Sequence, residues 1–545
     1  MQSILTILNR RFFTAAILYG IGLVIATLVI SYEICTWSCP QNNTSTEGNS
    51  ALCCNVSASE SGYSIVSVVN IWCLSSQTVF SRIIYRPFRV LVKGWNTYII
   101  ATIHSFLTWT STLIVILSTP AYNIDRARSD VPSAIVQQPW FFAFLILATF
   151  KFLKVFVHTA SFYLLTSPTQ QPVNATIFPN DVTVIVPSVG EFDGEFIECI
   201  ESIVANKPRR IIVSTAGYSK QAKAKKVCSE ISSRHLNARI TVLSMKEPNK
   251  RAQFLRGVSA SHTQIIAYAD DHVFWPPTFL KSALAPFEDQ RVGLVGVAKK
   301  VRRDRSGGFR CSFLNYIACL YLERHNFECT ASYNLDGGVF VISGRTALTR
   351  TNIVHHLHFR REFLNEKWFC GAVGPMKVDD DNCITRWMVN NRWKTVFHNS
   401  SDAVIETTLG TTGGLQKFRG QLLRWARTTW RSNSTSLFSD RTCWRAHPWT
   451  TYAMFISSFF NIALIYDPLL VLTLHRSGYT QYMYALLLAM LISKLIKPIE
   501  HLRREPQDII MLPLGILFGY VHSFFKVWAF FTAGNIQWSG RTGIK

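Results

Sequence analysis

The segment Gln421-Leu422-Leu423-Arg424-Trp425 places an amide, a guanidinium and an indole close together. If this segment is a helix, Gln421, Arg424 and Trp425 stand at positions i, i+3 and i+4 and project from one face. Such a face suits a sugar ring, because the polar groups can bind hydroxyls while the indole covers the C–H surface. The alternative is an amphipathic helix whose arginine and tryptophan lie at a membrane interface.

Two acidic clusters lie upstream of this segment. Asp270-Asp271-His272 closes an apolar run, and carboxylates fixed at a strand end can hold a divalent cation that also binds phosphate oxygens. Asp379-Asp380-Asp381 opens the helix-like segment Asn382–Trp387. Adjacent carboxylates repel each other, which raises a pKa and suits one of them to general-base work. The plainer interpretations are a solvated turn for the first cluster and a response to the helix dipole for the second.

A pair of cations, Lys250 and Arg251, stands just before the helix-like run Ala252–Ala260. Two adjacent cations at such a place could contact a diphosphate, although a solvated charge pair is the alternative. The stretch from Lys299 to Gly308 is also basic, but its pattern assigns it no specific role.

The elements that must position these residues lie in 175–415, where short β-branched runs alternate with helix-like stretches. This alternation is typical of an α/β domain. In open parallel sheets, ligands gather at the carboxyl ends of strands, so Pro187–Glu191 and Asp270–His272 are expected at one edge. The expected strands are Asp181–Val186, Arg209–Val213, Arg239–Leu243, Gln264–Ala269 and, after Gly337-Gly338, Val339–Ile342.

Apolar segments dominate the rest of the chain, which has 545 residues, too many for a single core. Several reach the roughly 20 residues that cross a bilayer. The net charge of +23 does not indicate nucleic-acid binding, because nothing resembles such a module and many cations flank apolar segments. Expected spans are 13–32, 63–81, 97–118, 139–165, 449–474 and 479–497, and 508–533 either crosses once or is re-entrant.

The expected topology puts the N-terminus and the α/β domain in the cytosol, because basic residues cluster on that side of the spans. Loop 33–62 then lies outside the cell. It carries Cys35, Cys39, Cys53 and Cys54 together with glycosylation acceptors at Asn42, Asn43 and Asn55. Clustered cysteines beside such acceptors indicate an oxidising compartment. The expected regions are 1–170 (membrane), 175–415 (α/β), 416–447 (amphipathic interface helices) and 448–545 (membrane and tail).

Taken in order, these pieces resemble the processive family 2 glycosyltransferases, the group of cellulose, chitin and hyaluronan synthases. Pro187–Glu191 resembles the Pro-Ser-Tyr-Asn-Glu loop of that family, and Asp270-Asp271 stands at its metal-binding Asp-x-Asp. Asp379–Asp381 stands at its Thr-Glu-Asp or Gly-Asp-Asp element, and Gln421–Trp425 matches Gln-x-x-Arg-Trp. Trp538-Ser539-Gly540-Arg541 resembles the Trp-Gly-Thr-Arg end of hyaluronan and chitin synthases, which favours a cytosolic tail and a re-entrant final segment.

The resemblance implies a cytosolic GT-A type domain, an α/β fold, between N- and C-terminal transmembrane helices. It makes Asp381, with Asp380 beside it, the catalytic base and Asp271 the ligand of a Mg²⁺ or Mn²⁺ ion. The substrate-binding residues that it implies are Glu191, Lys250, Arg251, Asp270, Gln421, Arg424, Trp425, Trp538 and Arg541.

Two departures from the family pattern stand out. Ala269 replaces the first acid of Val-Asp-Ser-Asp, and Ser214–Gly217 replaces the base-binding Asp-Asp-Gly, so the nucleobase must be recognised differently. The string Asp-Asp-His-Val-Phe-Trp-Pro looks most like a fungal capsular or cell-wall polysaccharide subgroup.

The expected function is that of a hexosyltransferase of the cell membrane. It would polymerise sugar from a UDP-sugar into an extracellular or outer cell-wall polysaccharide that supports fungal hyphal growth. Its partners would be the UDP-sugar, the growing glycan and membrane lipid. The alternatives are a non-processive transferase that forms glycolipid and a catalytically inactive membrane scaffold.

Overall fold

The computed structural model describes residues 138–411 and 414–536. The chain divides into two compact units, Met1–Pro139 and Trp140–Lys545, and nearly all of the described residues belong to the second. The first three expected spans, loop 33–62 with its acceptor asparagines, and Trp538 and Arg541 all lie outside the described residues. Predictions that concern them stay predictions.

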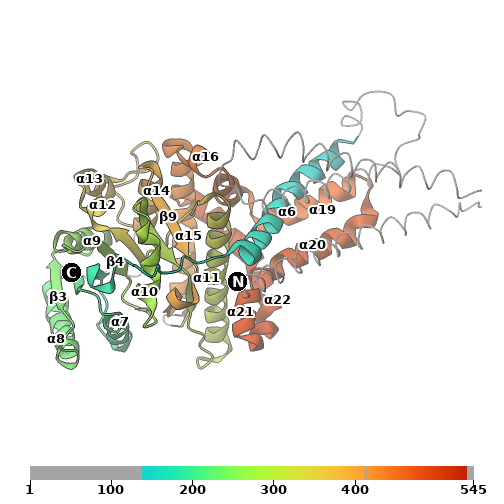
Figure 1. Cartoon of the computed structure of the whole chain (residues 1–545). Coiled ribbons are helices and arrows are strands. Elements are labelled where there is room, and N and C mark those ends of the chain that lie inside the picture. The colour runs from blue at the N-terminus through green and yellow to red at the C-terminus, as the bar shows by residue number, and fades with distance from the viewer. Residues whose placement is uncertain (1–137, 412–413, 537–545) are drawn as a thin grey trace, which may run out of the picture. The chain divides into compact units, whose positions relative to one another are not determined.

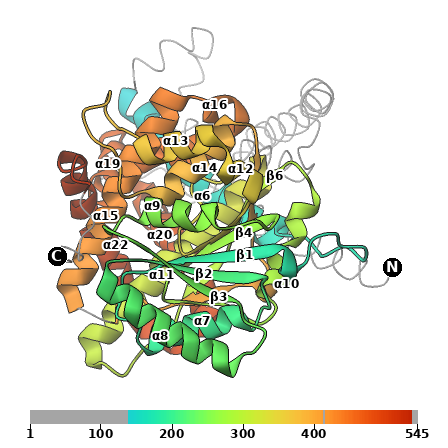
Figure 2. The ribbon, with the colours of Figure 1, turned by 90° about the vertical axis from the view of Figure 1, so that its left-hand side faces the viewer.

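A seven-stranded sheet forms the centre of the domain, with the strand order β3-β2-β1-β4-β8-β6-β9. Figure 2 shows β3, β2, β1 and β4 side by side. All neighbours run parallel except β8, which is antiparallel to both β4 and β6. This mixed α/β architecture confirms the expected fold class, and the first four strands lie where the sequence predicts them. The strands are β1 (Val182–Pro187), β2 (Arg210–Ala216), β3 (Ile240–Met245), β4 (Ile265–Ala269), β6 (Val292–Val297), β8 (Thr346–Arg350) and β9 (Lys394–His398).

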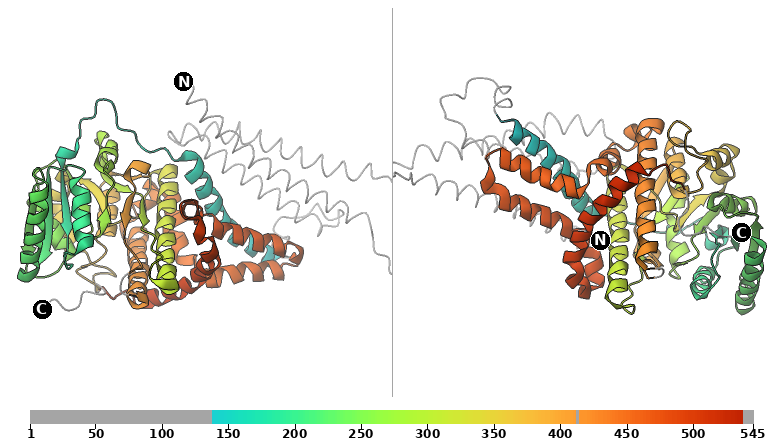
Figure 3. Two further views of the ribbon diagram at one scale, coloured as in Figure 1. Left: turned by 90° about the horizontal axis from the view of Figure 1, so that it is seen from below. Right: turned by 180° about the vertical axis from the view of Figure 1, so that it is seen from behind.

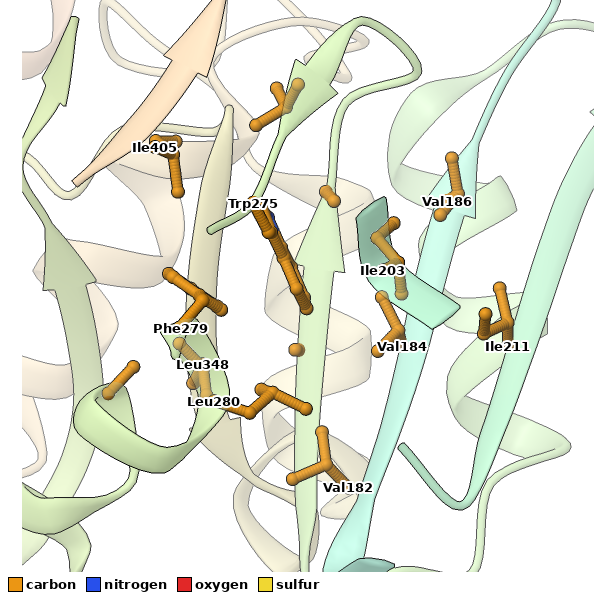
Figure 4. Packing of buried hydrophobic residues seen from close by; sticks show 14 of the residues in the cluster. Val182, Val184, Val186, Ile203, Ile211, Trp275, Phe279, Leu280, Leu348 and Ile405 are labelled. Carbon is orange, nitrogen blue, oxygen red and sulfur yellow. The ribbon is translucent and has the colours of Figure 1, made fainter. Parts of the chain in front are cut away.

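Helices cover both faces of the sheet because alternate side chains of each strand point to opposite sides. In β1, Val184 and Val186 join one buried cluster, whereas Ile185 joins the other. Figure 4 shows Val184 and Val186 on the same side as Ile203 of α7. The helices are α7 (Gly194–Val204) and α8 (Tyr218–Arg234) on that side, and α9 (Lys250–Ser259), α13 (Leu357–Asn365) and α14 (Asp380–Asn390) on the other.

Trp275 anchors the turn that follows β4. Its ring packs at a tilt against Phe279 with the ring centroids 4.2 Å apart (Figure 4). Its indole nitrogen donates to the Thr346 hydroxyl at 3.1 Å. This packing fixes the chain immediately after the acidic pair at the strand end. A small second sheet in the order β5-β10-β7 lies nearby, with β5 (Val273–Phe274), β10 (Ile405–Thr407) and β7 (Lys299–Val301).

The prediction of a strand at Val339–Ile342 is wrong, because this stretch has no regular structure and the strand is β8, a few residues later. The left-handed Gly337 instead ends the long helix α11 (Gly308–Asp336) as its C-cap. The side chains of Val339 and Ile342 are nevertheless buried. Their apolar character is what made this stretch look like a strand in the sequence. The remaining short helices of the domain are α10 (Phe279–Ala283) and α12 (Thr351–His355).

Two long helices, α11 and α15 (Gly414–Ser434), stand between the sheet and the apolar helices (Figure 1). Helix α15 packs against α22 (Leu512–Phe531) as well as against α11. After α15 the chain continues through α16 (Cys443–Ala446), α17 (Pro448–Thr450), α18 (Ser457–Phe460), α19 (Ala463–Arg476), α20 (Met483–Leu495) and α21 (Ile499–Arg504).

Apolar helices gather on the side of α11 and α15 that faces away from the sheet (Figure 3). Helix α6 (Pro139–Leu165) confirms a helix over the fourth expected span and is long and apolar enough to cross a membrane, as is the stretch Pro506–Phe531. The expected span 449–474 is instead a helix pair bent by 91° at a break, and Thr480–Leu495 is a shorter apolar helix. The C-terminal region is therefore less regular than the hydropathy pattern predicts.

Candidate active site

A cavity of about 1380 Å³ opens at the carboxyl ends of β1 and β4 and extends along α14, α11 and α15. It is larger than the roughly 300–1,000 Å³ of common small-molecule pockets. Most of its acidic lining residues come from the sheet edge and the start of α14, with Glu328 of α11 among the exceptions, and many of its cations come from α11, α15 and the apolar helices. The cavity therefore has room for two substrates and has charges separated along its length.

The strand-end cluster is held by a network of polar contacts. The Ser188 hydroxyl donates to Asp271 at 2.5 Å, and His272 lies 3.0 Å from the other oxygen of the same carboxylate. Lys250 Nζ lies 2.8 Å from Asp270 and 3.4 Å from Asp380, so it joins the two acidic clusters. Burial opposes the charge on Lys250, but the surrounding carboxylates outweigh it and raise the pKa of this lysine.

Asp381 lies at the N-terminus of α14, where one carboxylate oxygen accepts from the Gly344 N–H at 3.1 Å. The other oxygen accepts from Asn382 N–H at 2.9 Å. Burial and the adjacent Asp380 raise the pKa of Asp381, although Lys250 opposes the shift. The direction of this shift agrees with the expected effect of adjacent carboxylates, and it favours proton acceptance by this group.

Asp379 differs from Asp380 and Asp381 because its carboxylate binds side chains of α15. Its carboxylate accepts from Arg431 Nε at 2.8 Å and from the Thr428 hydroxyl at 2.5 Å, both on α15. Asp379 itself adopts a left-handed conformation, with φ of 60°, which aspartate tolerates better than most residues. The pair of Asp379 and Arg431 is almost fully buried and fixes α15 against the start of α14.

Gln421, Arg424 and Trp425 all line the cavity from one face of α15, as the helical spacing predicts. The Trp425 ring stacks on Tyr321 of α11 with centroids 4.8 Å apart. The Arg345 guanidinium lies 5.6 Å from the Trp425 ring centroid. The indole is thus packed and oriented by protein contacts, while part of its surface still faces the cavity.

Glu191 lies at the cavity mouth and is largely exposed. Its carboxylate pairs with Lys220 and, at 3.1 Å, with Lys223, both on α8. These hydrogen bonds lower the pKa of Glu191. The loop after β1 is therefore tied to the helix that follows β2.

Arg251 is not brought to this cavity, so its position does not support the expected contact with a diphosphate. The guanidinium is 1% exposed and donates to the carbonyl oxygens of Phe363 and Val378 at 2.6–3.1 Å. It also pairs with Glu366 at 2.5 Å. Arg251 therefore holds the segment that leads into the Asp379 cluster.

We expect Arg251→Met to lower the stability of the protein by about 3–5 kcal/mol, the usual cost of removing one partner from a buried ion pair. Thermal unfolding of the purified protein in detergent measures this loss. Arg256→Met is the matched control, because Arg256 lies on the same helix and is exposed. Equal melting temperatures for the two variants would contradict the structural role of Arg251.

Sequence reasoning missed two residues that contribute to the cavity. Arg345 lines it, and its Nε is buried without a hydrogen-bond partner among the described residues. Lys299, in the basic stretch that received no role, is buried and lies 2.9 Å from His325 of α11. Burial lowers the pKa of Lys299 to about 7. No local pattern marks Arg345, and the neighbour of Lys299 within β7 is another lysine, Lys300, so the sequence does not single out Lys299 either.

A divalent ion fits the chemistry of the strand-end donors, since Asp271 and Asp270 offer hard carboxylate oxygens at the cavity wall. Within the described ranges, no group of three or more His, Cys, Asp or Glu side chains is arranged to hold a metal alone. Mg²⁺ commonly binds proteins through one or two carboxylates and completes its shell with substrate phosphates and water.

Comparisons with known proteins extend these observations. Residues 179–428 match the family described as "Glycosyltransferase like family 2". A "Type 2 glycosyltransferase" of Pyricularia oryzae is 36% identical over 411 residues, which are 74% of this chain and 83% of that protein. A protein of the same name from Gibberella zeae is 33% identical over 414 residues, 74% of this chain and 76% of the relative.

More distant similarities were also found. The "NDP-glycosyltransferase ltbB" of Aspergillus luteorubrus is 25% identical over 69% of this chain and 91% of its own length. Among solved structures, a mannosyltransferase from Pyrobaculum calidifontis in complex with GDP-Man and Mn²⁺ covers 72% of this chain and 97% of its own chain, with 14% identity and a TM-score of 0.45.

Proposed function

Since the chain belongs to the family 2 glycosyltransferases and is a glycosyltransferase, we propose that it is a membrane-embedded, inverting GT-A enzyme that polymerises sugar from a UDP-sugar. The product would be an extracellular or outer cell-wall polysaccharide of a fungus. The observation that carries this proposal is the single cavity that joins the acidic strand end, Asp381 and the Gln421–Trp425 face.

The chemical step would be a single displacement at the anomeric carbon. Asp381 would accept the proton of the acceptor hydroxyl as that oxygen attacks the face opposite the departing UDP. An α-linked donor would then give a β-linkage. The Gly344 N–H and Asn382 hydrogen bonds hold the Asp381 carboxylate in one orientation, which suits a base that must meet the hydroxyl repeatedly.

The donor would lie beside the strand ends. Asp271, with Asp270 nearby, would hold a Mg²⁺ or Mn²⁺ ion, whose positive charge would stabilise the departing diphosphate. Lys250 would bring a second positive charge to the same place, because its Nζ already lies between the two acidic clusters. Ser188 orients Asp271 through a short hydrogen bond.

The acceptor would lie on the α15 face. Trp425 offers a ring held by Tyr321, and Gln421 and Arg424 line the same wall, so a terminal sugar could stack and bond there. The cavity continues from this face toward the bent helix pair, where Met454 lines it together with Asn461 at the break between α18 and α19. This continuation favours a product that leaves through the membrane region over one released into the cytosol.

The proposed location is the cell membrane, crossed several times, with the catalytic domain in the cytosol and loop 33–62 outside. Two apolar helices among the described residues support membrane embedding by their length and composition. The orientation rests on the distribution of basic residues in the sequence.

The proposal is tested with the purified full chain by measuring UDP release from a panel of UDP-sugars in the presence of Mg²⁺ or Mn²⁺. We expect one donor to give release above background and a product long enough to resolve as a polymer on a gel. Products of one or two sugars would instead identify a non-processive transferase. Release from no UDP-sugar, but from a GDP-sugar, would overturn the choice of nucleotide.

A further inference from the structure

A second cavity, of about 290 Å³, lies among helices α6, α11, α19 and α22 and the ends of α18 and α20. It shares lining residues with the active-site cavity, including Lys154, Arg324, Lys497 and Lys526. The two spaces are therefore neighbours, and the second is the one surrounded by apolar helices. We call it the inner cavity.

The inner cavity has an excess of positive charge. Its described lining residues include six cations and two carboxylates, namely Lys151, Lys154, Arg324, Lys494, Lys497 and Lys526 against Glu328 and Asp467. Charged side chains between apolar helices are costly unless they are paired or bind a ligand. The imbalance therefore calls for a counter-charge.

Each of the two carboxylates is already shared between lysines. Glu328 contacts Lys154 at 3.3 Å and also pairs with Lys497. Asp467 pairs with Lys151 and, at 2.7 Å, with Lys494. Within the described part of the chain, four lysines thus divide two negative charges between them.

The other two cations have no carboxylate partner among the residues that the structure describes. Lys526 donates to the backbone carbonyl of Asn461 at 2.7 Å, a neutral acceptor. The Arg324 guanidinium lies 4.6 Å from the Tyr321 ring centroid. His522 adds a buried ring nitrogen at the same wall, and this nitrogen has no hydrogen-bond partner among the described residues. Within that part of the chain, these groups form a set of donors that no carboxylate pairs with.

A phosphate group fits this set, because its several oxygens can accept charge-assisted hydrogen bonds from more than one cation. The surroundings favour a phosphate that is attached to a lipid. Helix α6 and the stretch Pro506–Phe531 are apolar enough to cross a membrane, and their outward side chains, such as Ile146, Leu517 and Phe524, are strongly exposed. Acyl chains could cover such surfaces while the head group enters the cavity.

We propose that the inner cavity binds the phosphate head group of a membrane lipid, with Arg324 and Lys526 as the principal contacts. Arg324 and Lys526 line both cavities, but Asp271, Asp381 and Trp425 do not line the inner one, and the site does not depend on which sugar is transferred. Because the cavities share a wall, the bound head group also supplies negative charge at the inner end of the active-site cavity.

The test measures the melting temperature of the purified full chain in detergent with three probes: dioctanoyl phosphatidic acid, dioctanoylglycerol and inorganic phosphate. A ligand that binds only the folded state raises this temperature. We expect phosphatidic acid to raise it clearly more than the other two. The rise should disappear in the double variant Arg324→Gln/Lys526→Gln and persist in Lys225→Gln, a control on the exposed side of α8.

Three results would overturn the proposal. An equal rise with dioctanoylglycerol would mean apolar binding without a head-group site, and an equal rise with inorganic phosphate would mean a small-anion site. A rise that survives in the double variant would place the binding elsewhere.

If the double variant does not fold, Lys526→Gln alone is compared with wild type. The amount of co-purified anionic lipid is measured by mass spectrometry, and equal amounts in the two proteins would contradict the proposal. UDP release is assayed separately, so failure of the transferase proposal is distinguished from failure of this one.

Discussion

Replacing Asp381 by Asn is expected to abolish sugar transfer while UDP binding stays close to that of the wild type. The amide keeps the size of the side chain but cannot accept the acceptor proton, and general-base catalysis contributes about 100- to 10,000-fold in rate. The measurement is initial UDP release with donor and acceptor present, alongside a UDP binding isotherm. Polymer formation by the Asn variant at the wild-type rate would remove Asp381 from its assigned role.

The pH profile gives a second measure of the same assignment. A base works in its deprotonated form, and burial together with Asp380 raises the pKa of Asp381. The transfer rate should therefore fall on the acid side at a pH above the usual range for an aspartate. Asp402→Asn, an exposed substitution outside the cavity, should leave both the profile and the rate unchanged.

Replacing Asp271 by Asn is expected to have the second large effect, the loss of metal-dependent UDP binding. Loss of an outer-shell partner costs about 10- to 100-fold in metal affinity, and loss of a direct carboxylate ligand should cost more. The measurement is UDP affinity with Mn²⁺ and with a chelator. Wild type should show a large difference between the two conditions, and Asp271→Asn should show little.

The variant Ser188→Ala serves as a control for Asp271→Asn. Asp271 also accepts from Ser188, so a general collapse of the strand end could imitate the loss of a metal ligand. Ser188→Ala removes this hydrogen bond and leaves the carboxylate in place, and it should retain most of the metal effect on UDP affinity. If Ser188→Ala and Asp271→Asn behave alike, Asp271 acts through packing rather than as a ligand.

The sequence pattern predicted the parts of the fold that local periodicity determines. Strands β1 to β4 are short β-branched runs that end in polar turns, and their order along the chain places Ser188 and Asp271 at one edge. The helical spacing likewise put Gln421, Arg424 and Trp425 on one wall. These predictions succeed because each depends on neighbours a few residues away.

Contacts between distant segments set the rest of the site and could not be read locally. Lys250 and Arg251 are adjacent, but successive helical residues point about 100° apart. Lys250 consequently enters the cavity, whereas Arg251 is buried against the segment before Asp379. Arg345 contacts Trp425 although the two residues are far apart in the sequence, and no sequence motif indicates this contact. The same limit explains why the bend between α18 and α19 escaped the hydropathy pattern.

The buried pair of Asp379 and Arg431 has a consequence for the order in which this enzyme matures. Helix α15 is held from its other side by the C-terminal region, since Arg431 donates to the Ala533 carbonyl at 2.7 Å and Arg427 to the Thr532 hydroxyl at 3.0 Å. Trp430 also donates to the Lys526 carbonyl at 2.9 Å. A ribosome delivers these partners about a hundred residues after α15 itself. Helix α15 is thus held on one side by Asp379 and on the other by residues that follow α22, so its full set of contacts forms only after the chain beyond α22 has been translated.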